Sequence, residues 1–269
     1  MKYLVSVLFR GMCVGGTMLV PGVSGGSMAM ILGIYDKLVS SVSSFFKHKK
    51  ESAVFIAPFC AGAAVGMVLF ARPLLALIDK FPMPMMYLFI GAVLGGVPLI
   101  YKEAGIKKIS WSVILYVIIG IAFVMLFELI PATESALAGK GLVQVIVMVA
   151  AGIFAAVALI LPGISISYVL LLMGIYDTVM EAIGTLQIVP LIPMGIGLVL
   201  GIILTTKLLE TAMTRCPVPT YMIILGFILG SVIQVFPGIP QGLEWLSCVL
   251  AFGAGYLIIY LISRAESAR

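Results

Sequence analysis

The chain has 269 residues, of which 62% are hydrophobic and only 10% are charged, and its formal net charge is +5. Its mean hydropathy of +1.26 leaves too little polar surface to cover a water-soluble globule, which excludes an ordinary soluble enzyme or binding domain. A modest positive charge is typical of basic loops beside membrane helices, so no nucleic-acid partner is expected.

Apolar runs long enough for helices recur along the whole chain, and they lack the ten-residue alternation of a membrane barrel. We therefore expect an all-α integral membrane protein. Five apolar segments are predicted in residues 1–134 and five more in residues 135–269, and the two sets form the halves of one membrane domain. The segments are 3–20, 24–40, 53–78, 84–100 and 110–130, followed by 142–161, 165–183, 188–213, 219–236 and 243–263.

A short motif, Pro21-Gly22-Val23-Ser24-Gly25-Gly26-Ser27, precedes the second segment, and Pro162-Gly163-Ile164-Ser165-Ile166-Ser167 precedes its counterpart in the second half. Proline and glycine end a helix, and a serine placed after them can cap the next one. A helix N-terminus presents unpaired N–H groups and partial positive charge, so the two turns predict a buried anion site. The alternative is that the glycines only permit close helix packing.

The two halves share more than this motif. Gly33-Ile34-Tyr35-Asp36 recurs as Gly174-Ile175-Tyr176-Asp177, at the same distance behind each turn. Further along, glycines and prolines of the third and fourth segments also recur in order, and the four-residue glycine spacing indicates helix packing. They are Gly62, Gly66, Pro82, Pro84, Gly91 and Gly95, matched by Gly197, Gly201, Pro217, Pro219, Gly226 and Gly230. Such matches indicate an internal duplication.

Charges in the loops predict the orientation. Lysine accumulates in 41–52 and 101–109, which places both loops in the cytoplasm, whereas the region between the halves is acidic. If the first two segments of each half form a hairpin and the other three cross, the second half runs inverted and both termini are cytoplasmic. Inverted repeats place a binding site near the membrane midplane, which is the architecture of secondary transporters.

Arg10 lies in the middle of the first segment. A full crossing would expose it to lipid, at a cost of about 2.5 to 3.5 kcal/mol or more. We therefore favour a re-entrant hairpin in each half over a hairpin that crosses fully.

Two cations occupy matching positions inside the long third segments, Arg72 in the first half and Lys207 in the second. They either extend to the interfaces or turn inward to hold an anionic group together with the serine turns. The predicted binding residues are Ser24, Gly25, Gly26, Ser27, Ser165, Ser167, Arg72, Lys207 and Arg10, on turns formed by Pro21, Gly22, Pro162 and Gly163.

Three carboxylates, Asp36, Asp177 and Glu128, are candidates for coupling transport to an ion. For the two Tyr-Asp pairs the alternative is anchoring at the membrane interface, where the second segments are expected to end. The cysteines lie singly, and no His cluster or Ser/His/Asp arrangement occurs, so we predict no metal, cofactor or catalytic residue.

These motifs together resemble the polyprenyl-phosphate transporter family of bacterial membrane proteins. The resemblance rests on Val20 to Ser27, on Ile31 to Asp36, on Leu161 to Ser165 with Gly174-Ile175-Tyr176, and on Arg72 and Lys207; Ile166 departs from it, since the second motif of the family often has glycine there. It implies a flippase that returns undecaprenyl phosphate from the outer to the inner leaflet of the bacterial cytoplasmic membrane, with H+ or Na+ as candidate coupling ions.

Two other functions remain open at this point. Membrane phosphatases that act on undecaprenyl pyrophosphate also contain a Pro-Gly-x-Ser turn, but arginine follows that turn, where this chain has Gly25 and Ile166. A transporter of a small soluble anion, or an ion channel, would need an enclosed aqueous site. The sequence makes no prediction of the oligomeric state.

Overall fold

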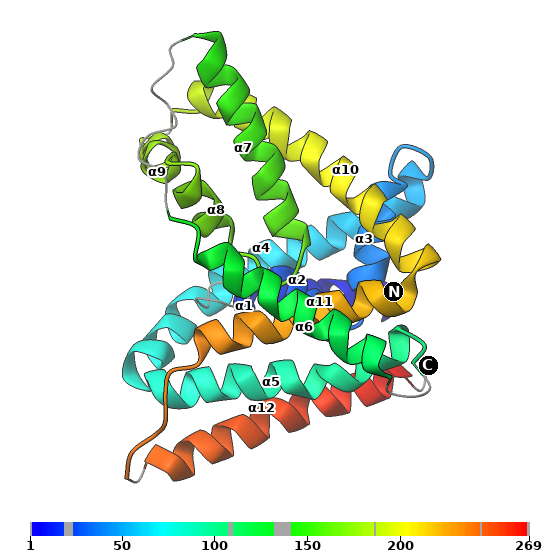
Figure 1. The fold of residues 1–269 in the computed structure, drawn as a ribbon, viewed down its shortest axis with the longest axis vertical. Coiled ribbons are helices and arrows are strands. Elements are labelled where there is room, and N and C mark those ends of the chain that lie inside the picture. Colours follow the sequence, from blue (N-terminus) through cyan, green and yellow to red (C-terminus); the bar gives the residue numbers. More distant parts are fainter. Residues whose placement is uncertain are drawn as a thin grey trace.

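The computed structural model describes residues 2–18, 24–106, 110–131, 141–185, 187–242 and 244–267, and within these ranges the chain is helical without any strand (Figure 1). The fold is therefore that of the predicted all-α membrane protein. Pro21, Gly22 and the predicted boundary between the halves at 134/135 lie outside the described residues.

Twelve α-helices follow one another in the described ranges. The first half contains α1 (Lys2–Thr17), α2 (Gly25–Ile31), α3 (Tyr35–Ser43), α4 (Lys49–Lys80), α5 (Pro82–Glu103) and α6 (Trp111–Glu128). The second half contains α7 (Leu142–Ile160), α8 (Ile166–Leu172), α9 (Tyr176–Gly184), a 3-10 turn (Val189–Leu191), α10 (Ile192–Arg215), α11 (Pro217–Val235) and α12 (Glu244–Ser267).

The second segment of each half differs from the prediction, because it forms two short helices instead of one. The chain breaks at Gly33 and at Gly174, whose φ angles of 66° and 62° lie in the left-handed region that glycine adopts without a steric penalty. Tyr35 consequently begins α3 and is only 2% exposed. The prediction that Tyr35 lies near the end of a helical segment is therefore wrong, whereas its place at a membrane interface stays a prediction.

Six helices are long and apolar enough to cross a membrane: α4, α5, α7, α10 with its preceding turn, α11 and α12. The predicted number of crossings was also six, but the prediction assigned α6 to a crossing and α7 to a hairpin. By length, α7 qualifies as a crossing helix and α6 does not, because the apolar part of α6 is shorter. Helices α2, α3, α8 and α9 have seven to nine residues each, too few to cross alone. Re-entrant hairpins stay a prediction.

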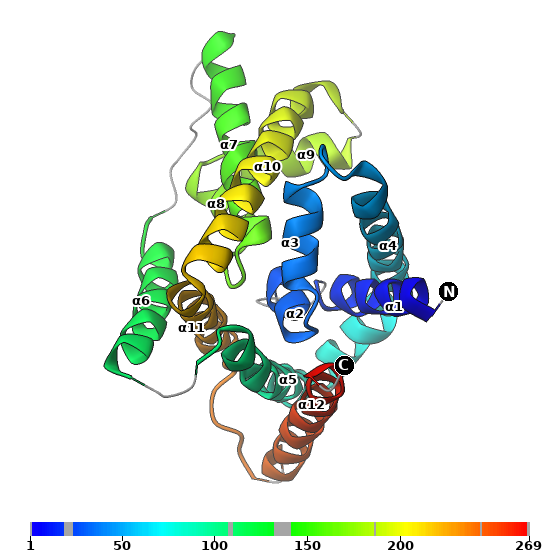
Figure 2. The ribbon, with the colours of Figure 1, turned by 90° about the vertical axis from the view of Figure 1, so that its right-hand side faces the viewer.

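The same helix pairs form in both halves. Helix α1 packs along α4, and its counterpart α7 packs along α10. The pairs that involve the last helix of each half are exchanged: α12 packs on α5, and α6 packs on α11 (Figures 1 and 2). This repeated pairing agrees with an internal duplication.

The repeated glycines lie where these helices touch. A Cβ atom added at Gly66 would lie 2.1 Å from the carbonyl oxygen of Met12 in α1, and one at Gly197 would lie 2.0 Å from that of Val149 in α7. A Cβ at Gly91 would lie 2.1 Å from the carbonyl oxygen of Phe252 in α12. The predicted packing role of these glycines is confirmed, because any side chain would separate the helix backbones.

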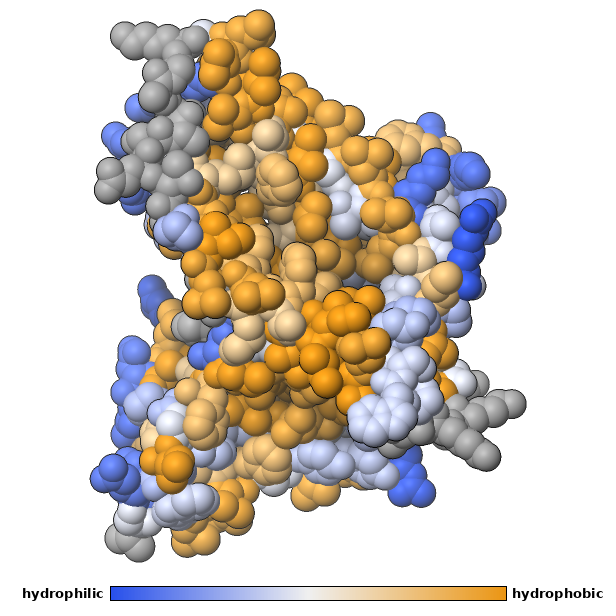
Figure 3. All heavy atoms as spheres, viewed as in Figure 1, coloured by the Kyte–Doolittle hydropathy of each residue, from blue (hydrophilic) through white to orange (hydrophobic). Residues whose placement is uncertain are grey.

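The two ends of the molecule differ. Both termini and α3 lie toward one end, on the right of Figure 1, whereas α8 and α9 lie toward the other. On the face shown in Figure 3, hydrophobic side chains cover the middle and hydrophilic ones gather mainly along the left and right edges. An apolar band between two polar edges is the surface expected of a protein that crosses a bilayer.

Candidate functional site

Both predicted helix caps are present. Ser24 has an extended backbone, and its Oγ accepts a 3.2 Å hydrogen bond from the N–H of Gly26, at the start of α2. Ser165 has the same role before α8, where its Oγ accepts a 3.4 Å bond from the N–H of Tyr168. The sequence therefore predicted correctly where these two helices begin.

The second turn is fixed by close packing against α11. Pro162 is fully buried, and Gly163 has a φ of 83°, which favours glycine. A Cβ atom at Gly163 would lie 2.3 Å from the carbonyl oxygen of Phe227. Both the backbone angle and the available space thus require glycine at this position.

The two repeated motifs touch each other. A Cβ atom at Gly26 would lie 3.1 Å from the carbonyl oxygen of Ile160 and 3.4 Å from the nitrogen of Pro162. The Tyr35 hydroxyl donates a 2.8 Å hydrogen bond to the same Ile160 carbonyl, which ends α7 and lacks a helical partner because the helix stops before proline. The second turn therefore lies against the first half.

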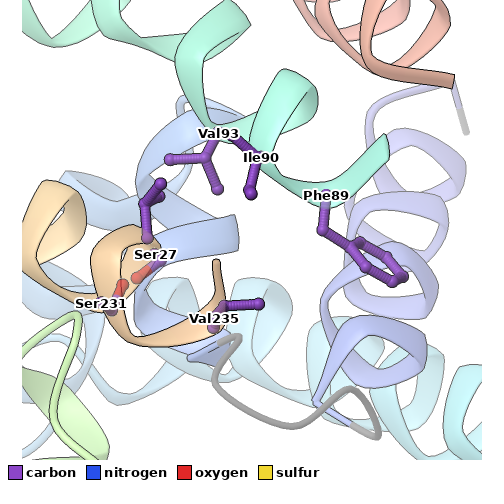
Figure 4. A pocket seen from close by; sticks show the side chains of 7 residues that line it. Ser27, Phe89, Ile90, Val93, Ser231 and Val235 are labelled. Carbon is purple, nitrogen blue, oxygen red and sulfur yellow. The ribbon is translucent and has the colours of Figure 1, made fainter. Parts of the chain in front are cut away.

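A small cavity adjoins Ser27, at the junction of α2, α5 and α11 (Figure 4). Ser27 is 2% exposed, and in the described part of the chain its Oγ is the buried side-chain oxygen that has no hydrogen-bond partner. Ser231 lies beside it, and its Oγ donates to the carbonyl of Ile228 at 2.8 Å while its lone pairs can still accept. The other walls are apolar: Phe89, Ile90, Val93, Val232 and Val235.

This cavity has a volume of about 10 Å³. That is the space of roughly one water-sized group. The two hydroxyls of Ser27 and Ser231 can therefore bind a single oxygen atom, either of a water molecule or of an oxyanion.

A second small cavity lies at the other turn, between α6, α8 and α11. Ser165 and Tyr168 line it together with Gln234 of α11. Gln234 and Ser231 are three residues apart, so one helix, α11, offers a polar side chain to each motif. Neither residue is among the predicted binding residues, although isolated polar side chains inside an apolar helix are a visible signal in the sequence.

A third cavity is much larger, about 300 Å³, and almost wholly apolar. Helices α1 to α4 of the first half and α7 and α10 of the second half line it, it is partly open to the surface, and Gly25 and Gly26 form part of its wall.

The predicted cations lie elsewhere. Arg72 on α4 and Lys207 on α10 are exposed, and neither lines any of the three cavities described above. Arg10 is half-buried on α1, and Ser167 is exposed on α8. The role of these four residues in binding stays a prediction.

Two acidic residues connect α3 to the second half. Asp36 accepts a hydrogen bond from the hydroxyl of Tyr221 in α11, and Glu210 of α10 accepts one from Ser43. One side of Asp36 is accessible, yet its packing partly desolvates the carboxyl group, which raises its pKa, while the Tyr221 hydrogen bond opposes that shift. Asp177 is exposed, and the side chain of Glu128 lies outside the described residues.

Residues 14–249 match a sequence family described as undecaprenyl phosphate translocase-like. A polyprenyl-phosphate transporter of Staphylococcus aureus is 31% identical over 270 residues, which cover 96% of this chain and 95% of the relative. A polyprenyl-phosphate transporter of Vibrio cholerae is 28% identical over 261 residues, 91% of this chain and 81% of the relative. No solved structure matches the chain significantly.

Proposed function

Because the chain belongs to the undecaprenyl phosphate translocase-like family, we propose that it carries a polyprenyl phosphate across the bacterial cytoplasmic membrane. The two relatives described above are named polyprenyl-phosphate transporters. The proposed substrate is undecaprenyl phosphate, and the proposed direction is from the outer to the cytoplasmic leaflet. The termini are then cytoplasmic, as the basic loops predict.

The observation that carries the proposed site is the contact between the two motifs. Gly26 packs against the backbone of Ile160 and Pro162, so the turn of one half adjoins the turn of the other. A group held there is in contact with both halves and responds to any movement between them. This is the position expected for the substrate of a transporter built from repeats.

The chemistry of the site suits a phosphate head group. Ser27 supplies a buried hydroxyl that has no partner among the described residues, and Ser231 supplies a second oxygen beside it. A buried donor without a partner costs free energy, which a phosphate oxygen would recover on binding. Arg72 and Lys207 are the proposed counter-charges, and they meet the head group where it enters or leaves the site.

Transport proceeds in this proposal by rocking of one half against the other, coupled to a proton or a sodium ion. Asp36 is the preferred coupling residue, since its carboxylate lies on α3 and binds Tyr221 on α11 of the other half. A change of its protonation state alters a contact between the halves. Asp177 and Glu128 are the weaker candidates.

Reconstitution tests the function directly. Purified protein in liposomes is given labelled undecaprenyl phosphate, and a membrane-impermeant reagent measures how much of the head group remains in the outer leaflet. Inorganic phosphate and undecaprenyl pyrophosphate are parallel substrates. Movement of the monophosphate lipid without phosphate release supports the proposal, whereas release of phosphate from the pyrophosphate would replace it with an enzyme. Movement of inorganic phosphate alone would indicate a transporter of soluble anions.

A further inference from the structure

The large apolar cavity lies between the two halves of the chain. Val39 and Val42 of α3 and Phe59 of α4 line it from the first half, while Leu159 of α7 and Ile202 of α10 line it from the second. Its volume is about 300 Å³. Contacts of α3 with both α4 and α10 keep these walls together.

The polar side chains in the wall already have partners. The hydroxyl of Tyr35 donates to the carbonyl of Ile160 at 2.8 Å, and that of Thr206 donates to the carbonyl of Ile202 at 2.7 Å. Apart from the thiol of Cys60, the remaining described side chains in the wall are apolar. Since a polar ligand would lose its hydrogen bonds to water without replacement, the cavity suits a hydrocarbon.

The size of the cavity indicates how much hydrocarbon it holds. An apolar cavity of about 150 Å³ binds benzene, a six-carbon molecule. Twice that volume therefore accommodates roughly two five-carbon isoprene units.

The large cavity reaches the motif that carries the proposed head-group site, although it shares no lining residue with the small cavity at Ser27. Gly25 and Gly26 form part of its wall, and they stand between the cap Ser24 and the buried Ser27. Glycine leaves this wall without side chains, so a hydrocarbon chain can approach the backbone of the motif closely. A chain in the cavity can thus place its phosphate end at the start of α2, next to the residues of the motif.

We propose that this cavity binds the isoprene units nearest the phosphate of the transported lipid, while the rest of the chain stays in the bilayer. This inference rests on the proposed function and adds to it that the protein recognises the first part of the hydrocarbon chain as well as the head group. Because walls from both halves surround the cavity, movement between the halves changes its shape and releases the chain together with the phosphate.

A chain-length series in detergent tests the inference. Isothermal titration measures the affinity of the purified protein for isoprenyl monophosphates with one, two, three and four isoprene units. We expect the affinity to rise by about tenfold from one unit to two, as burial of a Leu-sized apolar group predicts, and to level off beyond three. If the affinity does not rise from one isoprene unit to two, the inference is overturned.

A matched pair of variants on α4 locates the effect. Both residues are exposed, and only Cys60 lines the cavity. Cys60→Trp therefore places a large ring in the cavity wall, whereas Val65→Trp places one elsewhere on the same helix. In Cys60→Trp the affinity should no longer rise with the number of isoprene units, while the affinity for the one-unit phosphate should be unchanged. Val65→Trp should show the wild-type rise in affinity. Wild-type behaviour of Cys60→Trp overturns the inference.

The rate at which the Cys60 thiol reacts tests the inference without adding a bulky side chain to the cavity. In a variant with Cys13, Cys216 and Cys248 replaced by alanine, the three-unit phosphate should slow the reaction of Cys60 with N-ethylmaleimide at least fivefold, and inorganic phosphate should not. Equal rates with and without the three-unit phosphate contradict the inference. If the wild type binds no isoprenyl phosphate of any length, the proposed function fails, and this inference fails with it.

Discussion

The hydroxyl of Tyr35 donates a 2.8 Å hydrogen bond to the carbonyl oxygen of Ile160, 125 residues further along the chain. The bond joins the Gly-Ile-Tyr-Asp sequence of the first half to the last residue of α7, directly before the second Pro-Gly turn. Its counterpart in the second half is missing, since Tyr176 makes no side-chain hydrogen bond within the described residues. One copy of a repeated tyrosine thus joins the halves.

We expect Tyr35→Phe to lower the free energy of unfolding by about 1 to 3 kcal/mol, because it leaves the Ile160 carbonyl without a partner. Thermal unfolding of the detergent-purified protein measures the change. Tyr176→Phe is the control, as it removes a hydroxyl from the matching position, and its Tm should stay at the wild-type value. An equal Tm for Tyr35→Phe and Tyr176→Phe would show that the bond contributes nothing.

Gly26→Ala should impair transport, whereas Gly195→Ala, on α10 away from the cavities, should be tolerated. The new Cβ at Gly26 would lie 3.1 Å from a backbone oxygen of the other half, which cannot yield without moving α7. At Gly195 the added Cβ would meet no described atom outside its own helix within 4 Å. Overpacking at Gly26 costs about 1 to 3 kcal/mol. The transport rate in liposomes and the Tm of both variants test this difference. Equal transport rates and equal Tm values would show that transport does not require close contact between the two turns.

Ser27→Ala should separate stability from transport. Because the Ser27 hydroxyl is buried and no described residue pairs with it, its removal relieves an unpaired group, so we expect an unchanged or higher Tm. If the hydroxyl binds the head group, the same change lowers transport by roughly tenfold, which corresponds to one hydrogen bond to a charged group. A more stable variant with full transport would remove Ser27 from the site.

Arg72→Gln and Lys207→Gln should each abolish most transport at normal expression, because each removes a counter-charge for the phosphate. Initial transport rates at several substrate concentrations measure the loss. Arg215→Gln, at the end of α10, is the control for general loss of positive charge. Full transport by Arg72→Gln would assign Arg72 to anchoring at the membrane interface instead.

The pH dependence of stability tests the environment of Asp36. Desolvation raises the pKa of this carboxyl group in the folded protein above its ordinary value of about 3.9. The unfolded chain then loses its proton first as the pH rises, so folded stability falls between the ordinary pKa and the raised one. We expect the Tm of the wild type to fall relative to Asp36→Asn from pH 4 to neutral pH. Parallel curves for the two proteins would contradict the shift.

Local signals explain how much of the fold could be predicted. The lengths of the apolar runs predicted that the chain is helical. The serines after proline and glycine predicted the caps of α2 and α8, because a cap depends on residues within one turn. The sequence predicts one continuous segment through Gly33, since a glycine inside an apolar run looks the same whether it packs or breaks the helix. Its left-handed backbone appears only in the structure.

The candidate site depended on contacts that the sequence does not contain. The two motifs were predicted to share one site, and contact between Gly26 and Pro162 agrees with this expectation. The partners Ser231, Gln234 and Tyr221 all come from α11, and their counterparts in the first half are apolar, so the repeat did not point to them. Tertiary packing likewise decides which helix packs against the glycine-rich face of each other helix.

The exchanged helix pairs mean that neither half is complete by itself. A polypeptide that ended at residue 131 would contain the α1–α4 pair, but α5 would lack α12 and α6 would lack α11. Two copies of such a polypeptide could cover each α5 with the α6 of the other copy. The helix pairing of the present chain is thus the one expected of a helix-swapped dimer of two such polypeptides, joined as the predicted duplication implies.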